Sequence, residues 1–285
     1  METIQGAHIE LSKTENELVQ HLKQFCEHLR KSRPDLPSCE CRIAGGWVRD
    51  KLLGSTTTDM DVSLSSLTGL TFATLFLEYL TSIGVISRCD SEPHIIAANP
   101  AKSKALETAR KNILGIELDF VQLRTESYDE DSRIPEVTFG TPFQDAMRRD
   151  LTINSLFYNI HDCCVEDHTG LGLHDLLRHS ERPFIRTPLH AEVTFRDDPL
   201  RLLRSIRFAS RFEGTVHDEI FAAARNTTIR EALMTKISRE RVGSEVIKML
   251  QAPDPVYSMR MIHRMDIYSL IFYAPAVHQK KPSAT

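Results

Sequence analysis

The segment that most constrains this chain lies between residues 42 and 64 and joins a glycine pair, a short helix and two alternating aspartates. Arg42-Ile43-Ala44 predicts a short strand, and Gly45-Gly46 predicts a turn in which no side chain stands in the way. Residues 47–53 are predicted to form a helix that ends at Gly54, because glycine commonly follows the last turn of a helix. A glycine turn that leads into a helix offers backbone N–H groups to an anion.

Two aspartates follow this helix. Asp59 and Asp61 alternate with Met60, Val62 and Leu64, which predicts a strand with one buried and one polar face. Because side chains two apart in a strand share a face, the two carboxylates point the same way and repel each other, and cations between them would relieve that repulsion. A glycine pair alone is usually a plain turn, and Asp-x-Asp alone is usually a solvated strand or loop. Together they predict a metal-assisted site for a nucleoside triphosphate.

These residues carry a resemblance to a known family. The motif reads Gly45-Gly46-x-Val48-Arg49-Asp50-x-Leu52-Leu53-Gly54, followed by Asp59-x-Asp61. It is similar to the head of the tRNA nucleotidyltransferases (CCA-adding enzymes), which add C-C-A to tRNA 3′ ends. The resemblance is to the eukaryotic branch of the class II family, which also contains the bacterial poly(A) polymerases. It implies that Gly45, Gly46 and Arg49 bind the triphosphate and that Asp59 and Asp61 hold two Mg²⁺ ions.

A further carboxylate is a candidate for the same site. In this superfamily a third acid can lie on the strand next to the Asp-x-Asp strand and help to hold the metals. Residues 113–123 predict one strong strand, on which Glu117 and Asp119 share a face. Asp119 is therefore our candidate for a catalytic role, with Glu117 behind it. A solvent-facing acid without such a role remains open.

A second motif, Arg148-Arg149-Asp150-Leu151-Thr152-Ile153-Asn154, also matches the family. Two arginines beside an acid can be an ordinary salt-bridged surface. Next to a phosphate site, however, a guanidinium fork holds triphosphate oxygens and a carboxylate accepts from ribose hydroxyls. The resemblance implies that Arg149 contacts the nucleotide and that Asp150 lies at the ribose. Asn154 is expected to support the loop.

A third motif opens the helix predicted over residues 196–211. An aspartate cap and a proline in the first turn start this helix. At about 100° per residue, its apolar residues fall on one face and its arginines on the other; those arginines are Arg201, Arg204, Arg207 and Arg211. A solvated arginine face is the plain interpretation, but four arginines without interleaved acids repel one another and favour a bound polyanion.

Asp198 and Arg201 resemble the family's base-selecting Asp-Asp-x-x-Arg motif. Cytosine and adenine share an edge with an amino donor beside a ring-nitrogen acceptor, whereas uracil and guanine carry the reverse order. A carboxylate can accept from the amino group while a guanidinium donates to the ring nitrogen. The pair would therefore admit CTP and ATP and leave GTP and UTP mismatched. Arg204 and Arg207 are expected to face the triphosphate or the surroundings of the base.

The composition is that of a globular chain. Apolar residues make up 41% and charged residues 26%, which excludes disordered and fibrous classes. No apolar run approaches the roughly 18 residues of a membrane span, so we expect no membrane contact. The net charge is −4, so an RNA partner requires a local positive surface. The six cysteines form no Cys-x-x-Cys pair, which argues against zinc, and the first residues do not predict a signal peptide. We therefore expect reduced thiols and an intracellular location in the cytoplasm, nucleus or mitochondrion.

The expected fold is α+β, with a small mixed sheet and flanking helices in the head and an all-helical neck after it. The parts are a helical lead-in (1–34), a catalytic head (35–170), a neck (171–273) and a flexible tail (274–285). Among the finer expectations are strands at 85–88 and 94–98, a loop over 126–142, and helices only from residue 195 onward. The motif at 237–242 is expected to brace the base-selecting helix.

The function implied is template-independent addition of C and A to a tRNA 3′ end from CTP and ATP, with release of pyrophosphate. Eukaryotic members normally continue into a helical body and tail that grip the tRNA elbow; we expect neither within this sequence, which would then be a fragment or isoform or hold the acceptor end by another route. Three alternatives stay open: a poly(A) polymerase, an enzyme restricted to C-C or to A addition, and a truncated inactive form that only binds nucleotide or RNA.

Overall fold

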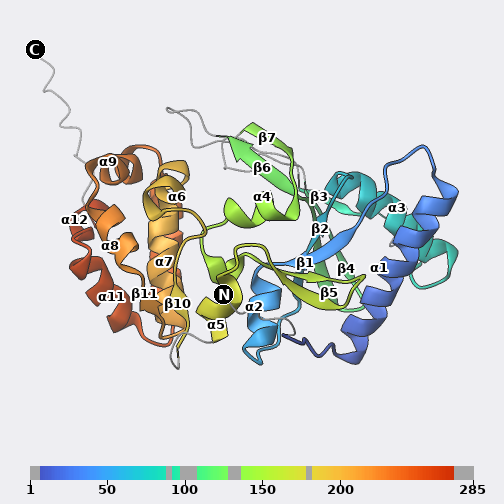
Figure 1. Ribbon diagram of the computed structural model, residues 1–285, viewed down its shortest axis with the longest axis horizontal. Helices are drawn as coiled ribbons and strands as arrows, with labels where there is room; N and C mark the ends of the chain where they lie inside the picture. Colours follow the sequence, from blue (N-terminus) through green and yellow to red (C-terminus); the bar gives the residue numbers. More distant parts are fainter. Residues whose placement is uncertain (1–6, 88–91, 97–107, 128–135, 178–181, 273–285) are drawn as a thin grey trace, which may run out of the picture.

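The computed structural model describes residues 7–87, 92–96, 108–127, 136–177 and 182–272. A head built around a mixed sheet is followed by a neck of helices, and the two lie side by side (Figure 1). The predicted α+β class is thus confirmed. Within the described ranges, no helix is long and apolar enough to cross a membrane. The expected tail lies outside the described residues.

The main sheet of the head has seven strands in the order β3-β4-β5-β2-β1-β8-β9. The central neighbours β2 and β5 are parallel, and every other adjacent pair in this sheet is antiparallel. The strands are β1 (Cys41–Ala44), β2 (Asp59–Leu64), β3 (His94–Ile96), β4 (Thr108–Ile113), β5 (Ile116–Gln122), β8 (Leu156–Asn159) and β9 (Cys164–Asp167).

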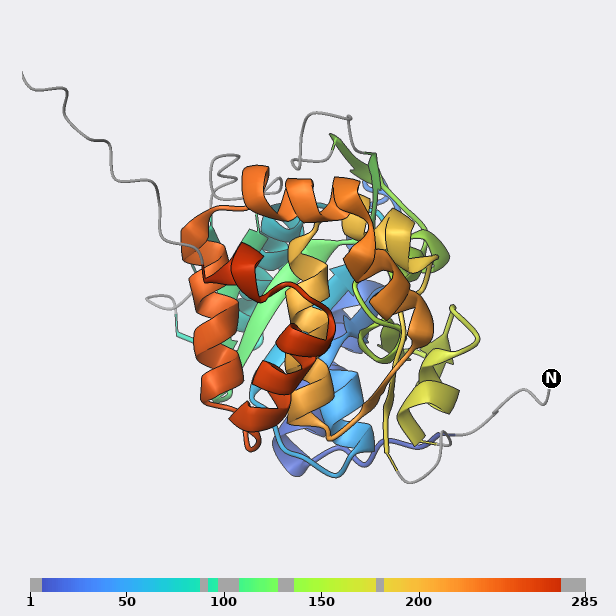
Figure 2. The same ribbon diagram turned by 90° about the vertical axis from the view of Figure 1, so that its left-hand side faces the viewer.

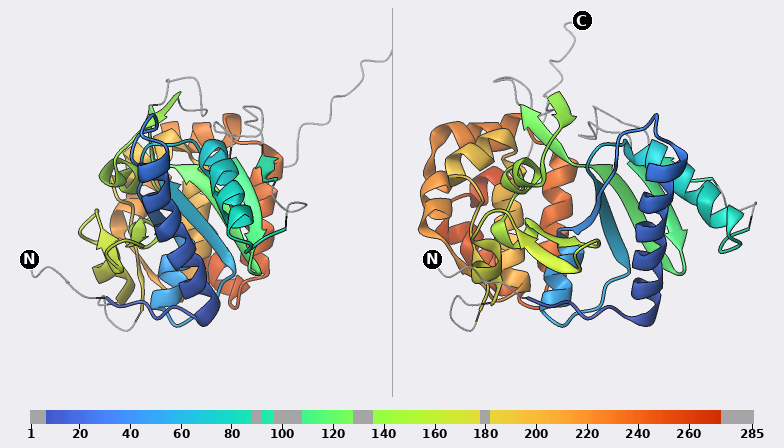
Figure 3. Two further views of the ribbon diagram at one scale, coloured as in Figure 1. Left: turned by 90° about the vertical axis from the view of Figure 1, so that its right-hand side faces the viewer. Right: turned by 45° about the vertical axis from the view of Figure 1, so that its right-hand side comes forward.

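Helices α1 and α3 cover one face of this sheet (Figure 3). A capping box starts α1, since the Ser12 hydroxyl accepts from the backbone of Glu15 and the Glu15 carboxylate accepts from the backbone of Ser12. The head also contains a 3-10 turn (Thr152–Asn154), and its helices are α1 (Lys13–Ser32), α2 (Gly46–Leu52), α3 (Gly69–Ser82), α4 (Pro142–Met147) and α5 (Gly172–Leu177).

The core of the head lies between these helices and the sheet. Phe25 of α1 packs edge-on against Phe72 of α3, with ring centroids 5.1 Å apart, and Phe72 in turn packs on Phe120 of β5. Met60 and Val62 are buried in the same core. The alternation in β2 therefore orients the strand as the sequence predicts, and it leaves Asp59 and Asp61 on the opposite face, which the helices do not cover.

In the neck, helix α7 is central and contacts α6, α10 and α11 (Figure 2). Its predicted apolar face is fully buried, including Leu203 and Ile206. A buried face of this kind fixes which way the arginines of the same helix point. The neck helices are α6 (Ala191–Asp197), α7 (Leu200–Arg211), α8 (Asp218–Arg225), α9 (Thr227–Thr235), α10 (Arg239–Leu250), α11 (Pro255–Arg264) and α12 (Tyr268–Ile271).

The structure corrects three details of the head. The strand predicted over 113–123 begins only at Ile116, as β5, because Leu114 and Gly115 both have positive φ and form a two-residue hairpin after Ile113, the last residue of β4. The loop predicted over 126–142 contains the end of β6 (Arg124–Ser127), which pairs with β7 (Glu136–Phe139), and the start of α4. Residues 85 and 86 form a bend rather than a strand, residue 87 has no regular structure, and residue 88 is not described.

One detail of the neck also differs from the prediction. A short parallel pair joins β10 (Phe184–Ile185) to β11 (Thr215–Val216), so the segment after residue 195 is not purely helical. The pair is only two residues long, too short for a period of two to show in the sequence.

Candidate nucleotide-binding cleft

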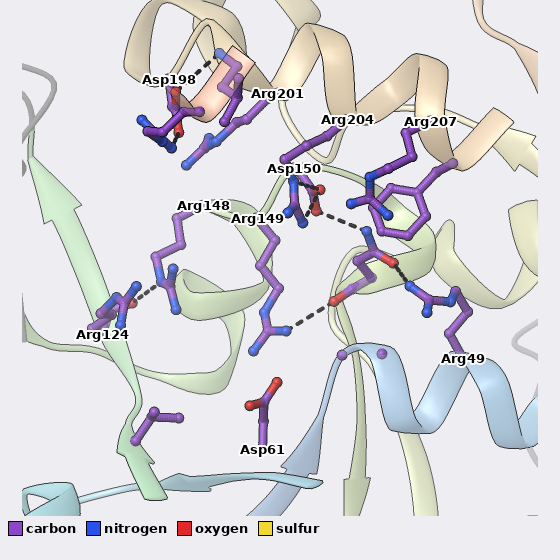
Figure 4. A pocket seen from close by; sticks show the side chains of 17 residues that line it. Arg49, Asp61, Arg124, Arg148, Arg149, Asp150, Asp198, Arg201, Arg204 and Arg207 are labelled. Carbon is purple, nitrogen blue, oxygen red and sulfur yellow. Dashed lines mark hydrogen bonds and ion pairs between the residues drawn. The ribbon is translucent and has the colours of Figure 1, made fainter. Parts of the chain in front are cut away.

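A cavity of about 530 Å³ lies between the open face of the sheet and helix α7 (Figure 4). Its size is within the range of small-molecule sites. Every residue expected to bind nucleotide lines it, and so does one of the two aspartates expected to hold metal: Gly45, Gly46, Arg49, Asp61, Arg149, Asp150, Asp198, Arg201, Arg204 and Arg207. Asp59 and Asp119 are not part of the lining.

The glycine turn forms one wall of the cavity. Gly45 has φ of 69°, in the region that favours glycine, and a Cβ at this position would lie 2.7 Å from Nη1 of Arg149. The turn is tied to β8 by a hydrogen bond from the Gly45 N–H to the carbonyl of Leu156. Glycine is therefore required here both for the backbone conformation and for the close approach of an arginine.

That arginine is held rigidly. The Nε and Nη2 atoms of Arg149 donate to one oxygen of Asp145 at 3.0 and 2.8 Å, and Nη1 donates to the carbonyl of Asn154 at 3.0 Å. Its guanidinium also lies 4.9 Å from the ring centroid of Phe157. Burial raises the pKa of Asp145, but Arg149 and Arg148 outweigh that effect and lower it. Figure 4 shows Arg149 and Asp61 facing each other across the cavity floor.

A hydrogen-bonded chain links the two motifs of the head to the neck. Arg49 donates to the side-chain oxygen of Asn154, whose amide donates to Asp150 at 3.0 Å, and Asp150 accepts from Arg204 of α7 at 2.6 Å. Burial alone would raise the pKa of Asp150, yet Arg204 and Asn154 together hold it at about 2. Asn154 therefore supports the loop, as expected, and it also couples Arg49 to Asp150.

The arginine face of α7 differs from the expectation. Each of its arginines lies beside an acid from elsewhere in the fold, so the prediction of an uncompensated positive face was wrong. The helix itself carries no interleaved acids, but tertiary folding supplies them. The pairs are Arg201 with Glu126 at 3.8 Å, Arg204 with Asp150 at 2.6 Å, Arg207 with Glu245 at 2.6 Å and Arg211 with Asp50 at 3.1 Å.

Asp198 follows directly after helix α6 and lines the same cavity. One of its oxygens accepts from the backbone N–H of Leu200 at 3.1 Å, and the other accepts from Arg241 of α10 at 2.9 Å. The expectation that the 237–242 motif braces the base-selecting helix is thus met by Arg241, which holds Asp198 shortly before α7, whereas Arg239 donates to carbonyls of α12. Arg201 donates to the carbonyl of Thr194 on α6 at 3.4 Å.

On the other side of the cavity, the strand register groups the acids. Asp61 pairs with Asp119 across β2 and β5, and Asp59 pairs with Glu117. Asp119 is held by Arg110, whose Nε and Nη2 atoms each lie 2.6 Å from one carboxylate oxygen. Within the described ranges, no three His, Cys, Asp or Glu side chains are grouped as a metal site would require.

The two aspartates of β2 fit a cation nonetheless. Both are exposed, and the described residues place no hydrogen bond or ion pair on either carboxylate. The protein around Asp61 displaces water from its carboxylate, and this loss of hydration raises its pKa. The nearby carboxylates of Asp119 and Asp59 raise it further, whereas Arg149 and Arg110 lower it. A carboxylate that is disfavoured in its ionised form gains most from a bound cation.

Sequence reasoning did not assign other residues that line the cavity: Val121, Arg124, Arg148, Leu200, Phe208 and Arg241. A local signal existed for one of them, because Asp145 lies three and four positions before Arg148 and Arg149 and pairs with both. The others reach the cavity through long-range packing. The ring of Phe208 in the neck, for example, lies 5.0 Å from the guanidinium of Arg49 in the head.

Comparisons with known proteins agree with this architecture. The family model described as "Poly A polymerase head domain" matches residues 41–180, and the model described as "Probable RNA and SrmB- binding site of polymerase A" matches residues 215–280. The chain is 45% identical over 269 residues to the mitochondrial CCA tRNA nucleotidyltransferase of Saccharomyces cerevisiae, covering 93% of this chain and 48% of that protein.

Two more distant relatives extend the comparison. The chain is 28% identical to Poly(A) polymerase I of Salmonella typhi, over 82% of this chain and 46% of that protein. The structure of the Thermotoga maritima CCA-adding enzyme complexed with tRNA superposes with a TM-score of 0.64 at 23% identity, over 93% of this chain and 55% of that one. The chain thus spans about half the length of the curated relatives it matches.

The head fold and the cleft it shares with a helical neck define a protein of the nucleotidyltransferase class. More specifically, the chain belongs to the class II family of CCA-adding tRNA nucleotidyltransferases and bacterial poly(A) polymerases, on its eukaryotic branch.

Proposed function

We propose that this chain catalyses template-independent transfer of cytidylate and adenylate from CTP and ATP to a tRNA 3′ end, releasing pyrophosphate. The observation that carries the proposal is one cavity whose head side presents Asp61 and the glycine turn and whose neck side presents Asp198 and Arg201. The yeast relative is named for the same activity, and the Thermotoga CCA-adding enzyme has been solved in complex with tRNA.

The triphosphate is assigned to the head side. Gly45 caps α2 and Gly46 is its first residue, so backbone N–H groups at the start of that helix can donate to phosphate oxygens. Arg149 adds a guanidinium that Asp145 and Phe157 already hold in place, so binding costs little side-chain entropy. Asp150 is assigned to the ribose.

The base is assigned to the neck side. Asp198 would accept from the amino group of cytosine or adenine while Arg201 donates to the ring nitrogen. Uracil or guanine would set a carbonyl against the carboxylate and an N–H against the guanidinium, leaving buried polar groups unpaired. Arg204 and Arg207 lie further along the same helix, and each is held by an acid while its guanidinium lines the cavity beside the phosphates.

We assign Mg²⁺ to Asp59 and Asp61, with Asp119 as a further catalytic candidate. Bound there, the cations would lower the pKa of the RNA 3′-hydroxyl and neutralise the leaving pyrophosphate. The protein's own contribution is to orient the α-phosphate between the aspartates and Arg149. For the compartment we propose an intracellular location, in keeping with the mitochondrial name of the yeast relative.

The test is the product formed on tRNA that lacks one, two or three terminal nucleotides. CCA addition predicts products that stop once the C-C-A end is complete. Long A tails would indicate the poly(A) polymerase that the Salmonella relative suggests, and extension of only some substrates would indicate a C-C- or A-restricted enzyme. CTP binding without any incorporation would indicate the truncated inactive form that only binds nucleotide or RNA. Asp61→Asn, which alters an exposed side chain, is the control that should fold normally and incorporate nothing.

A further inference from the structure

A row of paired residues crosses the open face of the sheet and continues beyond the cavity. Residues paired directly across neighbouring strands point to the same face. From the β3 edge to β8 the row is His94, Arg110, Asp119, Asp61, Ala44 and Phe157. The cavity lining includes Asp61 but none of His94, Arg110 and Asp119.

The geometry of nucleotidyl transfer indicates which molecule contacts the outer part of the row, His94, Arg110 and Asp119. In nucleotidyl transfer the attacking oxygen and the leaving group lie roughly in line on opposite sides of the phosphorus. If the pyrophosphate leaves on the side of Arg149, the attacking RNA end must approach Asp61 from the side of Asp119 and Arg110. This step rests on the proposed function.

Arg110 has the geometry to contact that RNA. Its backbone lies two strand spacings from Asp61, about 10 Å, and its side chain extends along the same face. Asp119 holds the guanidinium by Nε and Nη2, which leaves Nη1 directed elsewhere, 3.7 Å from Glu117 and beyond hydrogen-bonding distance. The side chain is 44% exposed.

The charges around Arg110 also favour a contact between this residue and RNA. Asp59, Asp61, Glu117 and Asp119 share its face, and by themselves they would repel an RNA backbone. Arg110 is the cation of this row among the described residues, and His94 lies exposed beside it on β3. A guanidinium fork fits a phosphate as well as it fits a carboxylate.

We propose that Arg110, flanked by His94, binds the phosphodiester that precedes the 3′-terminal nucleotide of the RNA substrate. Arg110 thereby positions the attacking end over the aspartates and opposes their repulsion. It is a substrate-positioning residue outside the nucleotide cavity.

The test compares Arg110→Gln with a matched control, Arg33→Gln. Arg33 is equally exposed at 44% and is likewise held by an aspartate, Asp35, but it follows α1 on the helix-covered side of the head. Binding of trimmed tRNA and of CTP is measured separately across a salt series. Arg110→Gln should weaken RNA binding about three- to tenfold and flatten the log–log salt dependence by about 0.7, the value for one single-strand phosphate contact. The CTP affinity of Arg110→Gln should equal that of the unsubstituted chain. The RNA and CTP affinities of Arg33→Gln should both equal those of the unsubstituted chain.

A second pair of variants separates RNA contact from an effect through Asp119. Arg110→Lys keeps the charge and should restore most of the salt dependence. Arg110→Gln combined with Asp119→Asn should keep the RNA defect, whereas restored RNA affinity would mean that Arg110 acts only on Asp119 and would overturn the proposal. Unchanged RNA affinity in Arg110→Gln, with an unsubstituted chain that extends tRNA normally, would overturn it too. Failure of the unsubstituted chain to bind RNA would instead remove the proposed function and this inference together.

Discussion

Arg241 of α10 holds the carboxylate of Asp198 from the neck side, with Nη2 of Arg241 2.9 Å from Oδ2 of Asp198. The other oxygen of Asp198 accepts from the backbone of Leu200. These two contacts fix the carboxylate at the cavity wall. A group that imitates a base partner needs such support, because a misplaced hydrogen-bond acceptor loses its power to discriminate.

Replacing Arg241 with glutamine should therefore impair nucleotide addition without unfolding the neck. Loss of one charge-assisted hydrogen bond corresponds to about 1–2 kcal/mol, or about a 5- to 30-fold lower kcat/KM for CTP and ATP. Steady-state kinetics on trimmed tRNA measure this. Arg225→Gln, an exposed arginine of α8, serves as the control. A kcat/KM for the Arg241 variant equal to that of this control would contradict the assigned support.

Replacing Arg201 with alanine should relax base choice more than it weakens triphosphate binding. Arg201 would supply the donor to the ring nitrogen, and one such contact discriminates by about 1–3 kcal/mol. The preference for CTP over UTP should therefore fall about tenfold or more in competition assays. Because Arg201 is buried, circular dichroism should confirm that the variant is folded. Unchanged selectivity in a folded variant would remove Arg201 from base recognition.

Replacing Gly45 with alanine tests the close approach of Arg149 to the glycine turn. The matched control is Gly54→Ala, since Gly54 has a similar φ of 72° but no atom within 4 Å of the added Cβ. Both substitutions should lower stability through backbone strain, and Gly45→Ala should cost more, up to about 3 kcal/mol, because the ψ of Gly45 is −121°, outside the left-handed helical region. Only Gly45→Ala should also raise the KM for CTP, because its Cβ displaces the guanidinium of Arg149. Equal KM values for the two variants in the addition assay would count against this role of the turn.

Asp150 should make a pH-dependent contribution to stability. Its pKa of about 2 lies below the roughly 3.9 of an unfolded aspartate, so the ionised group stabilises the fold above about pH 4, and this contribution disappears as the pH falls toward 2. Allowing for the partly exposed Arg204, it amounts to about 2 kcal/mol at pH 7.

Urea unfolding of Asp150→Asn at pH 7 and pH 3 measures this contribution. The difference in free energy of unfolding from the unsubstituted chain should be clearly smaller at pH 3. Asp35→Asn, in an exposed pair, should show little effect at either pH. A deficit for Asp150→Asn that is the same at both pH values would show that Asp150 is not stabilised as an ion.

Local sequence patterns were sufficient for much of the site. The glycine turn, the polar face of β2 and the apolar face of α7 each follow from a short-range period or from glycine's conformational freedom, and the structure has all three. The resemblance to a family then predicted that segments far apart in the chain meet at one site, and Asp61 and Asp198 do line one cavity.

The features that sequence reasoning missed depend on contacts between distant segments. The arginines of α7 seemed uncompensated because their acids lie on other elements, among them Glu245 on α10 and Asp50 on α2. The hairpin at Leu114 and Gly115 was missed because its first strand, β4, is mostly polar and lacks the alternation that indicates a strand, so that only its pairing with β5 defines it. In both cases the deciding interaction forms only when the chain has folded.

The most direct test of the central claim is the incorporation of each of the four labelled nucleoside triphosphates into trimmed tRNA. The claim is that an acidic pair for metal and a protein-made base partner act in one cleft. It predicts incorporation from CTP and ATP and little or none from UTP and GTP, with Asp61→Asn inactive on all four. Comparable incorporation of all four nucleotides, or full activity of Asp61→Asn, would contradict it.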